Sequence, residues 1–347
     1  MQCLAKEASN CKFSGRSFFM SLMIGFLLLS SGFKKEEHLN MYSLTGLAQG
    51  TTYHISYYAP TSKITKVQID SIINKIDSSM SVYKPYSLIS AFNKAQTRVT
   101  MDYHFKKVIE KSLEISKKSN GAFDITVYPL VSAWGFGPVK TKNLPDSNQI
   151  KSILENVGYQ HLKIKDNQLL KDKPSVKIDV NGIAQGYSVD LIASFLEGKG
   201  IHRFIVELGG ELIVKGKKPK NEFFKVGIEA VNAEDFSPVK KYIEIDRGAV
   251  TTSGSYRKFH QAGGKKVNHL IDPKTGYYLQ NELISVTIYA KNAITADGFD
   301  NVLMGLGLKK AMSFLAKEKD LEAYLVYTEN GVVKDTCSAG FPKIQKF

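Results

Sequence analysis

The spacing of apolar residues in the first half of the chain predicts short strands mixed with amphipathic helices. Alternation predicts a strand over residues 49–59, and helical spacing predicts helices over 64–76 and 102–118, the second closed by Asn120-Gly121. Further elements are predicted along the next hundred residues: a helix over 147–157, a hairpin over 162–171 that turns at Asp166-Asn167, a strand over 176–180 and a helix over 187–197.

The second half is richer in strands. The pattern predicts strands over 204–207, 211–214, 224–230, 242–245 and 284–290, then helical segments over 302–315 and 309–317 and a hairpin that turns at 329–331. Strands and helices are mixed without a regular βαβ rhythm, which favours an α+β fold over a doubly wound sheet. We see no internal repeat and no long linker.

Length and composition indicate a globular protein. The chain has 347 residues, of which 43% are hydrophobic, enough for one large domain or two small ones. Its three cysteines are too few for a disulfide scaffold, and Cys337 is expected to have no partner because Cys3 and Cys11 lie in a leader region. Since no Cys/His cluster has zinc-ligand spacing, we expect oxygen atoms to hold any metal.

The N-terminus has the features of a targeting segment. Lys6, Lys12 and Arg16 precede the apolar run 18–29, and small residues follow it. The run is short for a membrane span, although an uncleaved anchor would also fit. No cysteine stands where a lipoprotein signal would need its acceptor, so no lipid anchor is expected.

We therefore divide the chain into residues 1–33, an export signal or N-terminal anchor, a short linker over 34–44, and one domain over 45–347. The protein is expected in the periplasm or at the outer face of the inner membrane. A formal net charge of +14 favours an anionic partner: a phosphate-bearing ligand, an acidic membrane surface or nucleic acid. Export argues against nucleic acid, and no basic run alternates with stacking aromatics. A solvated basic surface would also explain the charge.

The segment 294–301 is the strongest chemical signal. It places Asp297 and Asp300 at the expected junction between the strand over 284–290 and the helix over 302–315. Two carboxylates at such a junction can share a hard cation. Taken alone, they could equally complement the dipole at the helix N-terminus.

Two glycine-containing loops in the middle of the chain could bind a ligand. In the loop 177–187, glycines let the backbone approach a ligand, and Asp179 and Gln185 add side-chain partners. The loop 207–211, Glu-Leu-Gly-Gly-Glu, has the same character. A tight strand-to-helix turn explains the first loop as well, and a hairpin turn explains the second.

Two later loops add polar groups. The loop 250–257 brings together hydroxyls, a glycine and Arg257, a set suited to phosphate oxygens or to a plain polar turn. In the loop 268–276, His269 could act as a general base near neutral pH, while Asp272 begins a turn sequence. A structural histidine is the competing interpretation.

Eight segments in order resemble the ApbE family, the flavin transferases also called FAD:protein FMN transferases. The match runs from about residue 45 to about residue 320, and the segments are QGTTYHI, MSVYKPYSLISAFN, GAFDITVYPLVSAWGFG, IDVNGIAQGYSVD, ELGGELIVKG, TTSGSYRKF, HLIDPKTG and TADGFDNVL. The resemblance implies a single α+β, T-fold-like domain with mixed sheets and helices around an FAD-binding cleft. It also implies Mg²⁺-dependent cleavage of FAD, attachment of FMN through its phosphate to a Thr or Ser of an acceptor protein, and release of AMP.

The family's site positions can be carried over residue by residue. The flavin-binding positions fall on Gln49, Tyr83, Ala122, Phe123, Asp124, Asp179, Gln185 and Ile271. The magnesium positions fall on Gly182, through its backbone carbonyl, and on Asp297, Asp300 and Asn301. The chain departs from the family at three of these positions. Gln49 stands where methionine is common, Gln185 where lysine or glutamate is common, and Asn301 where threonine is usual.

The resulting hypothesis assigns each group a task. Asp297 and Asp300 hold the metal on the pyrophosphate, and His269 takes the proton of the acceptor hydroxyl with help from Asp272. Phosphate oxygens and aromatic rings of FAD are assigned to Thr252, Ser253, Arg257, Tyr83 and Phe123.

Two other functions remain open at this point. An FAD pyrophosphatase would use water in place of the acceptor hydroxyl, and a flavin-binding protein would leave FAD intact. The sequence does not name the acceptor, which by resemblance is an exported or membrane-bound subunit of an electron-transfer complex.

Overall fold

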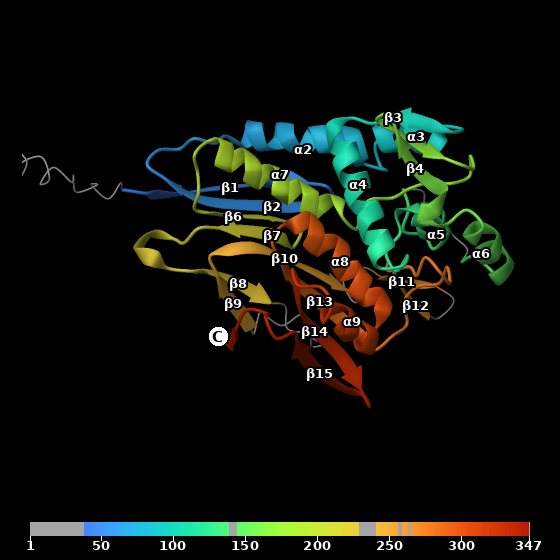
Figure 1. Ribbon diagram of the computed structural model, residues 1–347. Helices are drawn as coiled ribbons and strands as arrows, with labels where there is room; N and C mark the ends of the chain where they lie inside the picture. The colour runs from blue at the N-terminus through green and yellow to red at the C-terminus, as the bar shows by residue number, and fades with distance from the viewer. Residues whose placement is uncertain (1–37, 139–143, 229–240, 256–258, 263–264, 347) are drawn as a thin grey trace, which may run out of the picture. The chain divides into compact units, whose positions relative to one another are not determined.

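The computed structural model describes residues 38–138, 144–228, 241–255, 259–262 and 265–346 (Figure 1). The predicted leader, 1–33, and Arg257 lie outside these residues. No helix within the described ranges is both long and apolar enough to cross a membrane. Residues 39–347 belong to one compact unit.

One antiparallel sheet of eight strands dominates this unit. In their spatial order, the strands are β1 (Asn40–Ala48), β2 (Thr51–Ala59), β6 (Phe204–Leu208), β7 (Glu211–Lys215), β10 (Arg247–Gly254), β13 (Leu283–Ala290), β14 (Leu321–Glu329) and β15 (Val332–Cys337). Smaller sheets contain β3 (Arg98–Thr100), β5 (Gln168–Lys171) and β4 (Leu162–Lys165), then β16 (Ile344–Lys346), β9 (Lys241–Ile245) and β8 (Phe224–Ile228), and finally β11 (Phe259–Ala262) and β12 (Lys265–Asn268).

The predicted helices are present with shifted ends, and two further helices, α3 (Leu88–Lys94) and α5 (Tyr128–Ala133), were not predicted. In chain order the helices are α2 (Lys66–Met80), α3, α4 (Tyr103–Lys118), α5, α6 (Ser147–Leu154), α7 (Ala184–Gly198), α8 (Ala293–Leu306) and α9 (Leu308–Leu315), with 3-10 turns η1 (Ile125–Val127), η2 (Tyr159–His161) and η3 (Pro219–Asn221). The mixture of antiparallel sheets and helices confirms the α+β prediction.

The sheet is covered on both faces. Period-two alternation along β2 buries Tyr53, Ile55 and Tyr57 completely, in a cluster with apolar residues of α2 and α7. The other face of the sheet packs on β8 and β9 through a separate cluster that includes Val226 and Ile243. Figure 1 shows α2 and α7 over one face and β8 and β9 on the other.

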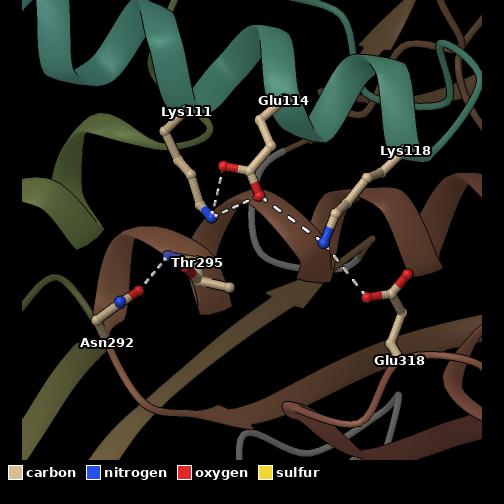
Figure 2. A network of polar contacts seen from close by, with 6 residues as sticks. All are labelled: Lys111, Glu114, Lys118, Asn292, Thr295 and Glu318. Atoms are coloured by element: carbon tan, nitrogen blue, oxygen red, sulfur yellow. Dashed lines mark hydrogen bonds and ion pairs between the residues drawn. The ribbon is translucent and has the colours of Figure 1, made fainter.

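A charged network extends from α4 toward α8 and α9 (Figure 2). Glu114 accepts from Lys111 at 3.0 Å and lies 3.8 Å from Lys118, which reaches Glu318 at 3.5 Å. These side chains are all partly exposed to solvent, so the network adds little stability. The buried contacts among α4, α8 and β13 hold this layer together instead.

The first strand was missed in the sequence. Residues 40–44, predicted as linker, belong to β1, which is an edge strand and therefore mostly exposed, with weak apolar alternation. The strand predicted over 49–59 is β2, which begins at Thr51, two residues later than predicted. Gln49 and Gly50, with φ of 50° and 78°, form the turn between β1 and β2 instead.

The predicted strand over 176–180 is wrong. This segment forms no strand and pairs with none of the described strands. Asn93 occupies both backbone groups of Ile178, donating to its carbonyl at 2.9 Å and accepting from its N–H at 2.7 Å. The Asp179 N–H donates to the Ile125 carbonyl at 2.7 Å. The Asn93 side chain and the Ile125 carbonyl therefore form the hydrogen bonds that a neighbouring strand would have formed.

Helix α8 starts well before the predicted helix. Asn292 is its N-cap, and its side-chain oxygen accepts the Thr295 N–H at 3.1 Å (Figure 2). Asp297 and Asp300 therefore lie inside α8, on adjacent turns, and not at its mouth as predicted. Their shared face follows from the three-residue spacing.

The loop predicted over 250–257 is partly strand. Its first five residues, 250–254, belong to β10, which lies between β7 and β13 in the main sheet. Thr252 stands opposite Thr287, and their hydroxyl oxygens are 2.9 Å apart. The polar residues of this segment led to the prediction of a loop, although its valine and threonines favour a strand inside a sheet.

Candidate active site

One cavity, of about 420 Å³, collects most of the predicted site. Its volume is typical of small-molecule sites. The wall includes Gln49, Tyr83, Ala122, Phe123, Asp124, Asp179, Gly182, Gln185, Thr252, Ser253, His269, Ile271, Asp297, Asp300 and Asn301. Segments from both halves of the chain thus meet in one place.

Asp272 does not belong to the wall of this cavity as described. Its carboxylate accepts the Lys274 N–H at 2.9 Å and the Thr275 hydroxyl at 3.0 Å, and so closes a turn. This turn shapes the loop that carries His269, and the assistance of Asp272 to that imidazole stays a prediction. The predicted phosphate contact of Arg257 lies outside the described residues.

Reciprocal hydrogen bonds join α7 to α8 and fix the acids. Asp190 of α7 accepts the N–H groups of Ala293 and Ile294, each at 2.8 Å, at the start of α8. In return, Asp297 of α8 accepts the Gly186 N–H of α7 at 2.7 Å. Glycine is required at position 186 because a Cβ there would overlap the Ala293 carbonyl.

The two acids of α8 are nearly inaccessible, with Asp297 5% and Asp300 2% exposed, and both line the cavity. Burial, together with the charge of Asp190, raises the pKa of Asp297 to about 7. Burial and the charge of Asp297 raise the pKa of Asp300 well above its usual value. Two ionised carboxylates in this place need a positive partner, which a divalent cation would supply.

The other predicted metal ligands converge on one point. The Asn301 side-chain nitrogen donates to the Gly182 carbonyl at 3.2 Å and to Asp300 Oδ1 at 2.9 Å. A carbonyl and a carboxylate thus surround the same position. In this orientation Asn301 presents its amide nitrogen to them, and reversal of the amide would present its oxygen.

Asp179 and Tyr83 form another part of the wall. Asp179 accepts the backbone N–H of Asn181 at 2.8 Å and its side-chain amide at 3.2 Å, and burial raises the pKa of Asp179 to about 6. Burial and the charge of Asp179 raise the pKa of Tyr83. Since Tyr83 lines the cavity yet is 58% exposed, its ring stands at the mouth.

Asp124 holds the wall in shape. One carboxylate oxygen accepts the Thr126 N–H at 2.9 Å and the Thr126 hydroxyl at 2.6 Å, and the other accepts the Tyr159 N–H at 2.6 Å. These bonds keep the neighbouring Phe123 and Ala122 along the cavity. Burial raises the pKa of Asp124.

Two glutamines line the opposite part of the wall. The Gln49 side-chain nitrogen donates a hydrogen bond to the Ser188 hydroxyl at 2.9 Å. The Gln49 side-chain oxygen is buried without a hydrogen-bond partner among the described residues. That oxygen is available to a ligand N–H. Gln185 lies close to Gly209, where a Cβ would come within 2.9 Å of the glutamine nitrogen.

Hydroxyl and imidazole groups complete the site. Thr252 and Ser253 reach the cavity from β10, and His269 reaches it from the segment after β12. The His269 ring packs edge-on against Phe136, with centroids 6.3 Å apart. A substrate in this cavity would meet acids, hydroxyl donors and one titratable imidazole.

Three polar residues were not selected from the sequence. Asn181 and Glu211 line the cavity, and the charge of the buried Glu211 contributes to the raised pKa of Asp300. An acid directly after paired glycines is a local signal that could have identified Glu211. Asp190 gave no such signal, because its partners are backbone groups distant in sequence.

The donor set fits a hard cation that keeps part of its coordination for substrate and water. Within the described ranges, no cluster of three or more His, Cys, Asp and Glu residues is arranged to hold a metal. Two carboxylates, one carbonyl and one amide oxygen are instead what Mg²⁺ takes from a protein when phosphate oxygens and water complete its shell.

The comparisons with known proteins agree with one another. The ApbE family matches residues 49–325. An FAD:protein FMN transferase of Haemophilus influenzae is 34% identical over 318 residues, which cover 88% of this chain and 92% of that protein. One of Vibrio cholerae is 31% identical over 331 residues, 93% of this chain and 98% of that protein.

Solved structures show the same relationship. The flavin transferase ApbE from Vibrio cholerae superposes with a TM-score of 0.80 at 30% identity, covering 88% of this chain and 99% of its own. The apo form of the Pseudomonas stutzeri flavinyl transferase ApbE gives a TM-score of 0.78 at 29% identity, with 87% and 96% covered.

Proposed function

This chain belongs to the ApbE family, and on that basis we propose that it is an FAD:protein FMN transferase. It takes FAD as substrate and joins the FMN part to a hydroxyl of another protein. One observation carries the chemical proposal: two buried acids, a backbone carbonyl, hydroxyl groups of β10 and an imidazole line one cavity of about 420 Å³.

The finer proposal is that the site holds Mg²⁺. Asp297 and Asp300 would bind it with the Gly182 carbonyl and with the Asn301 side-chain oxygen, once that amide is reversed. When bound, the ion would neutralise pyrophosphate oxygens that otherwise repel an attacking hydroxyl. The raised pKa of Asp297, about 7, supports this proposal, because a cation would keep that carboxylate ionised at neutral pH.

The protein's own groups then orient the substrate and move one proton. His269 accepts the proton of a threonine or serine hydroxyl, whose oxygen bonds to the FMN-side phosphorus. The bond from that phosphorus to the bridging oxygen breaks, and AMP leaves with that oxygen. Thr252 and Ser253 donate to phosphate oxygens. Asp272 holds the turn in the loop that carries His269.

The remaining wall suits the rings of FAD. Phe123 is mostly buried and Tyr83 stands at the mouth, so the two can contact the flavin and adenine. The buried Gln49 oxygen would accept an N–H from the flavin. Contacts of Asp179 and Gln185 with the ligand are part of the same proposal.

The acceptor protein and the cellular location are proposals that rest on the sequence. The segment 1–33 supports export to the periplasm or to the outer face of the inner membrane. The acceptor would accordingly be an exported or membrane-bound electron-transfer subunit that offers a threonine or serine.

Incubation with FAD, Mg²⁺ and a candidate acceptor domain tests the function. Mass spectrometry is expected to find an added FMN on the acceptor, and chromatography an equal amount of AMP. Free FMN without labelled acceptor would indicate a hydrolase, and intact FAD would indicate a binding protein. Either result, with several acceptor domains, would contradict the transferase.

A His269→Gln variant separates chemistry from binding. We expect FAD affinity close to that of the unchanged protein and a transfer rate lower by about 10²–10⁴-fold, the usual contribution of a general base. The matched control is His161→Gln, since His161 bonds to Asp172 and does not line the cavity. Equal rates for the two variants would remove His269 from the mechanism.

A further inference from the structure

The two ends of the main sheet carry different groups. At one end, the β1–β2 and β6–β7 turns line the cavity. At the other end, Asn40 pairs with Ala59, and Phe204 pairs with Lys215. The chain therefore enters β1 at the end from which the β7–β8 loop leaves, and Figure 1 shows both at that end.

The β7–β8 loop is basic and exposes an aromatic ring. It carries Lys217, Lys218 and Lys220 against a single acid, Glu222. Phe223 is 40% exposed, and the Lys217 ammonium lies 4.3 Å from the centre of its ring. Charge and apolar surface are thus presented together.

An exposed methionine lies at the same end of the sheet. The loop leads into β8, whose first residue, Phe224, packs against the end of β2, since the rings of Phe224 and Tyr58 lie 6.4 Å apart. Met41 pairs directly with Tyr58 and so shares its face of the sheet. Met41 is 62% exposed. We call the following residues the basic patch: Met41, Lys217, Lys218, Lys220 and Phe223.

The charges beside the loop are of both signs. Among the described residues, Lys215–Glu197, Lys225–Glu244 and Arg247–Asp246 form ion pairs on the adjoining segments. Arg203 lies against Gly216 at the start of the loop, and the Arg247 hydrogen bond together with the charge of Lys217 lowers the pKa of Asp246. The loop itself carries three lysines against one acid. Exposed apolar side chains beside lysines match the interfacial zone of a bilayer, where headgroup phosphates lie above acyl chains.

We propose that the basic patch binds the surface of an anionic phospholipid bilayer. The three lysines contact headgroup phosphates, while Phe223 and Met41 enter the acyl boundary. An acidic protein surface would also satisfy the lysines, and the choice of lipid rests on the predicted N-terminal anchor next to the patch.

The position of the N-terminal segment supports this occupant. The apolar run 18–29 ends eleven residues before Asn40. Even fully extended, that connection spans no more than about 40 Å. A run held in a membrane would therefore keep the basic patch close to the lipid surface, which raises its effective concentration there.

Sedimentation with vesicles tests the proposal on the full chain. The ratio of binding to phosphatidylcholine vesicles with and without phosphatidylglycerol removes the apolar insertion of the leader, which contributes to both. The charges of Lys6, Lys12 and Arg16 in the leader are the same in every variant, so a change of the ratio between variants reports the patch. Changing Lys217, Lys218 and Lys220 to Ala together is expected to lower that ratio on the order of 100-fold, about fivefold for each lysine near an anionic surface. The loss should shrink in high salt.

A matched variant controls for net charge. Changing Lys107, Lys163 and Lys165 to Ala together removes the same charge from exposed positions on α4 and β4. We expect this variant to keep the anionic preference of the unchanged protein. An equal loss in both variants would mean a diffuse charge effect and overturn the proposal, as would an unchanged ratio in the patch variant.

A fluorescent reporter tests insertion separately. The chain has one tryptophan, Trp134, which is buried at 4% exposure. In a Phe223→Trp variant, anionic vesicles should shift the new emission to shorter wavelength, and an unshifted spectrum would exclude insertion of this side chain. Cleavage of FAD in solution should stay as in the unchanged protein, so failure here leaves the proposed transferase untouched.

Discussion

The Gly186 N–H donates to Asp297 Oδ2 at 2.7 Å, a bond between the first turn of α7 and the acid face of α8. It allows the two helices to approach closely enough that the Gly182 carbonyl, just before α7, shares a cavity with the acids. The site therefore depends on a helix contact as much as on the acids themselves.

Gly186→Ala should damage both stability and activity. The added Cβ would lie 2.7 Å from Asp297 Cβ and would overlap the Ala293 carbonyl, so α7 and α8 must separate. We expect a loss of about 2–3 kcal/mol in unfolding free energy, as for other overpacked cores, and FMN transfer below a tenth of normal. Denaturant titration and the transfer assay measure the two effects.

The control for this variant lies on the same helix. At Gly198 a Cβ would meet no atom within 4 Å. Gly198→Ala should be neutral or stabilising by up to about 1 kcal/mol, because alanine favours a helix. Equal destabilisation in both variants would contradict the close-contact explanation.

Asp300→Asn should separate metal binding from folding. The amide keeps the shape of the side chain but removes a negative charge that is 2% exposed. Mg²⁺ affinity by calorimetry should fall at least tenfold, and the melting temperature without metal should rise, since a buried unpaired carboxylate is costly. A variant with unchanged Mg²⁺ affinity would exclude Asp300 from the metal site.

Stability without metal should depend on pH through Asp297. Its folded pKa of about 7 exceeds the ordinary 3.8, so the folded state binds the proton more tightly. The corresponding stability is fully present below pH 3.8 and is lost as pH rises through about 7. The melting temperature of Asp297→Asn minus that of the unchanged protein, measured in EDTA, should therefore increase over this window. A difference that stays flat would refute the raised pKa.

Lys171→Met should destabilise the segment that leads into the site. Lys171 is 5% exposed, and its ammonium donates to the carbonyls of Phe92 at 3.1 Å, Pro174 at 3.0 Å and Val176 at 2.9 Å. Leaving these acceptors unpaired should cost about 3 kcal/mol. The exposed Lys173, which reaches one carbonyl, provides the control, and Lys173→Met should change stability by less than about 0.5 kcal/mol.

Local signals in the sequence predicted the parts of the fold that depend on local chemistry. The hairpin at Asp166-Asn167 was correct because both residues tolerate the positive φ that the turn requires. The stop of α4 at Asn120-Gly121 was correct for the same reason. The motif matches also selected residues that the fold then gathered into one cavity.

Elements set by distant partners could not be predicted in the same way. The pattern over 176–180 alternates like a strand, yet Asn93 satisfies its backbone groups. The start of α8 depends on Asp190, which binds the first N–H groups of that helix from another helix. The turn that begins at Asp272 was recognised in the sequence, and the structure adds its partners, the Lys274 N–H and the Thr275 hydroxyl.

Strand β2 runs without interruption from the turn at the cavity to Ala59 beside the basic patch. At about 3.3 Å per residue, its nine residues measure roughly 27 Å from end to end. With the basic patch on lipid and β2 along the bilayer normal, the cavity would lie at about this height above the headgroups. An acceptor threonine or serine would then have to reach the same height.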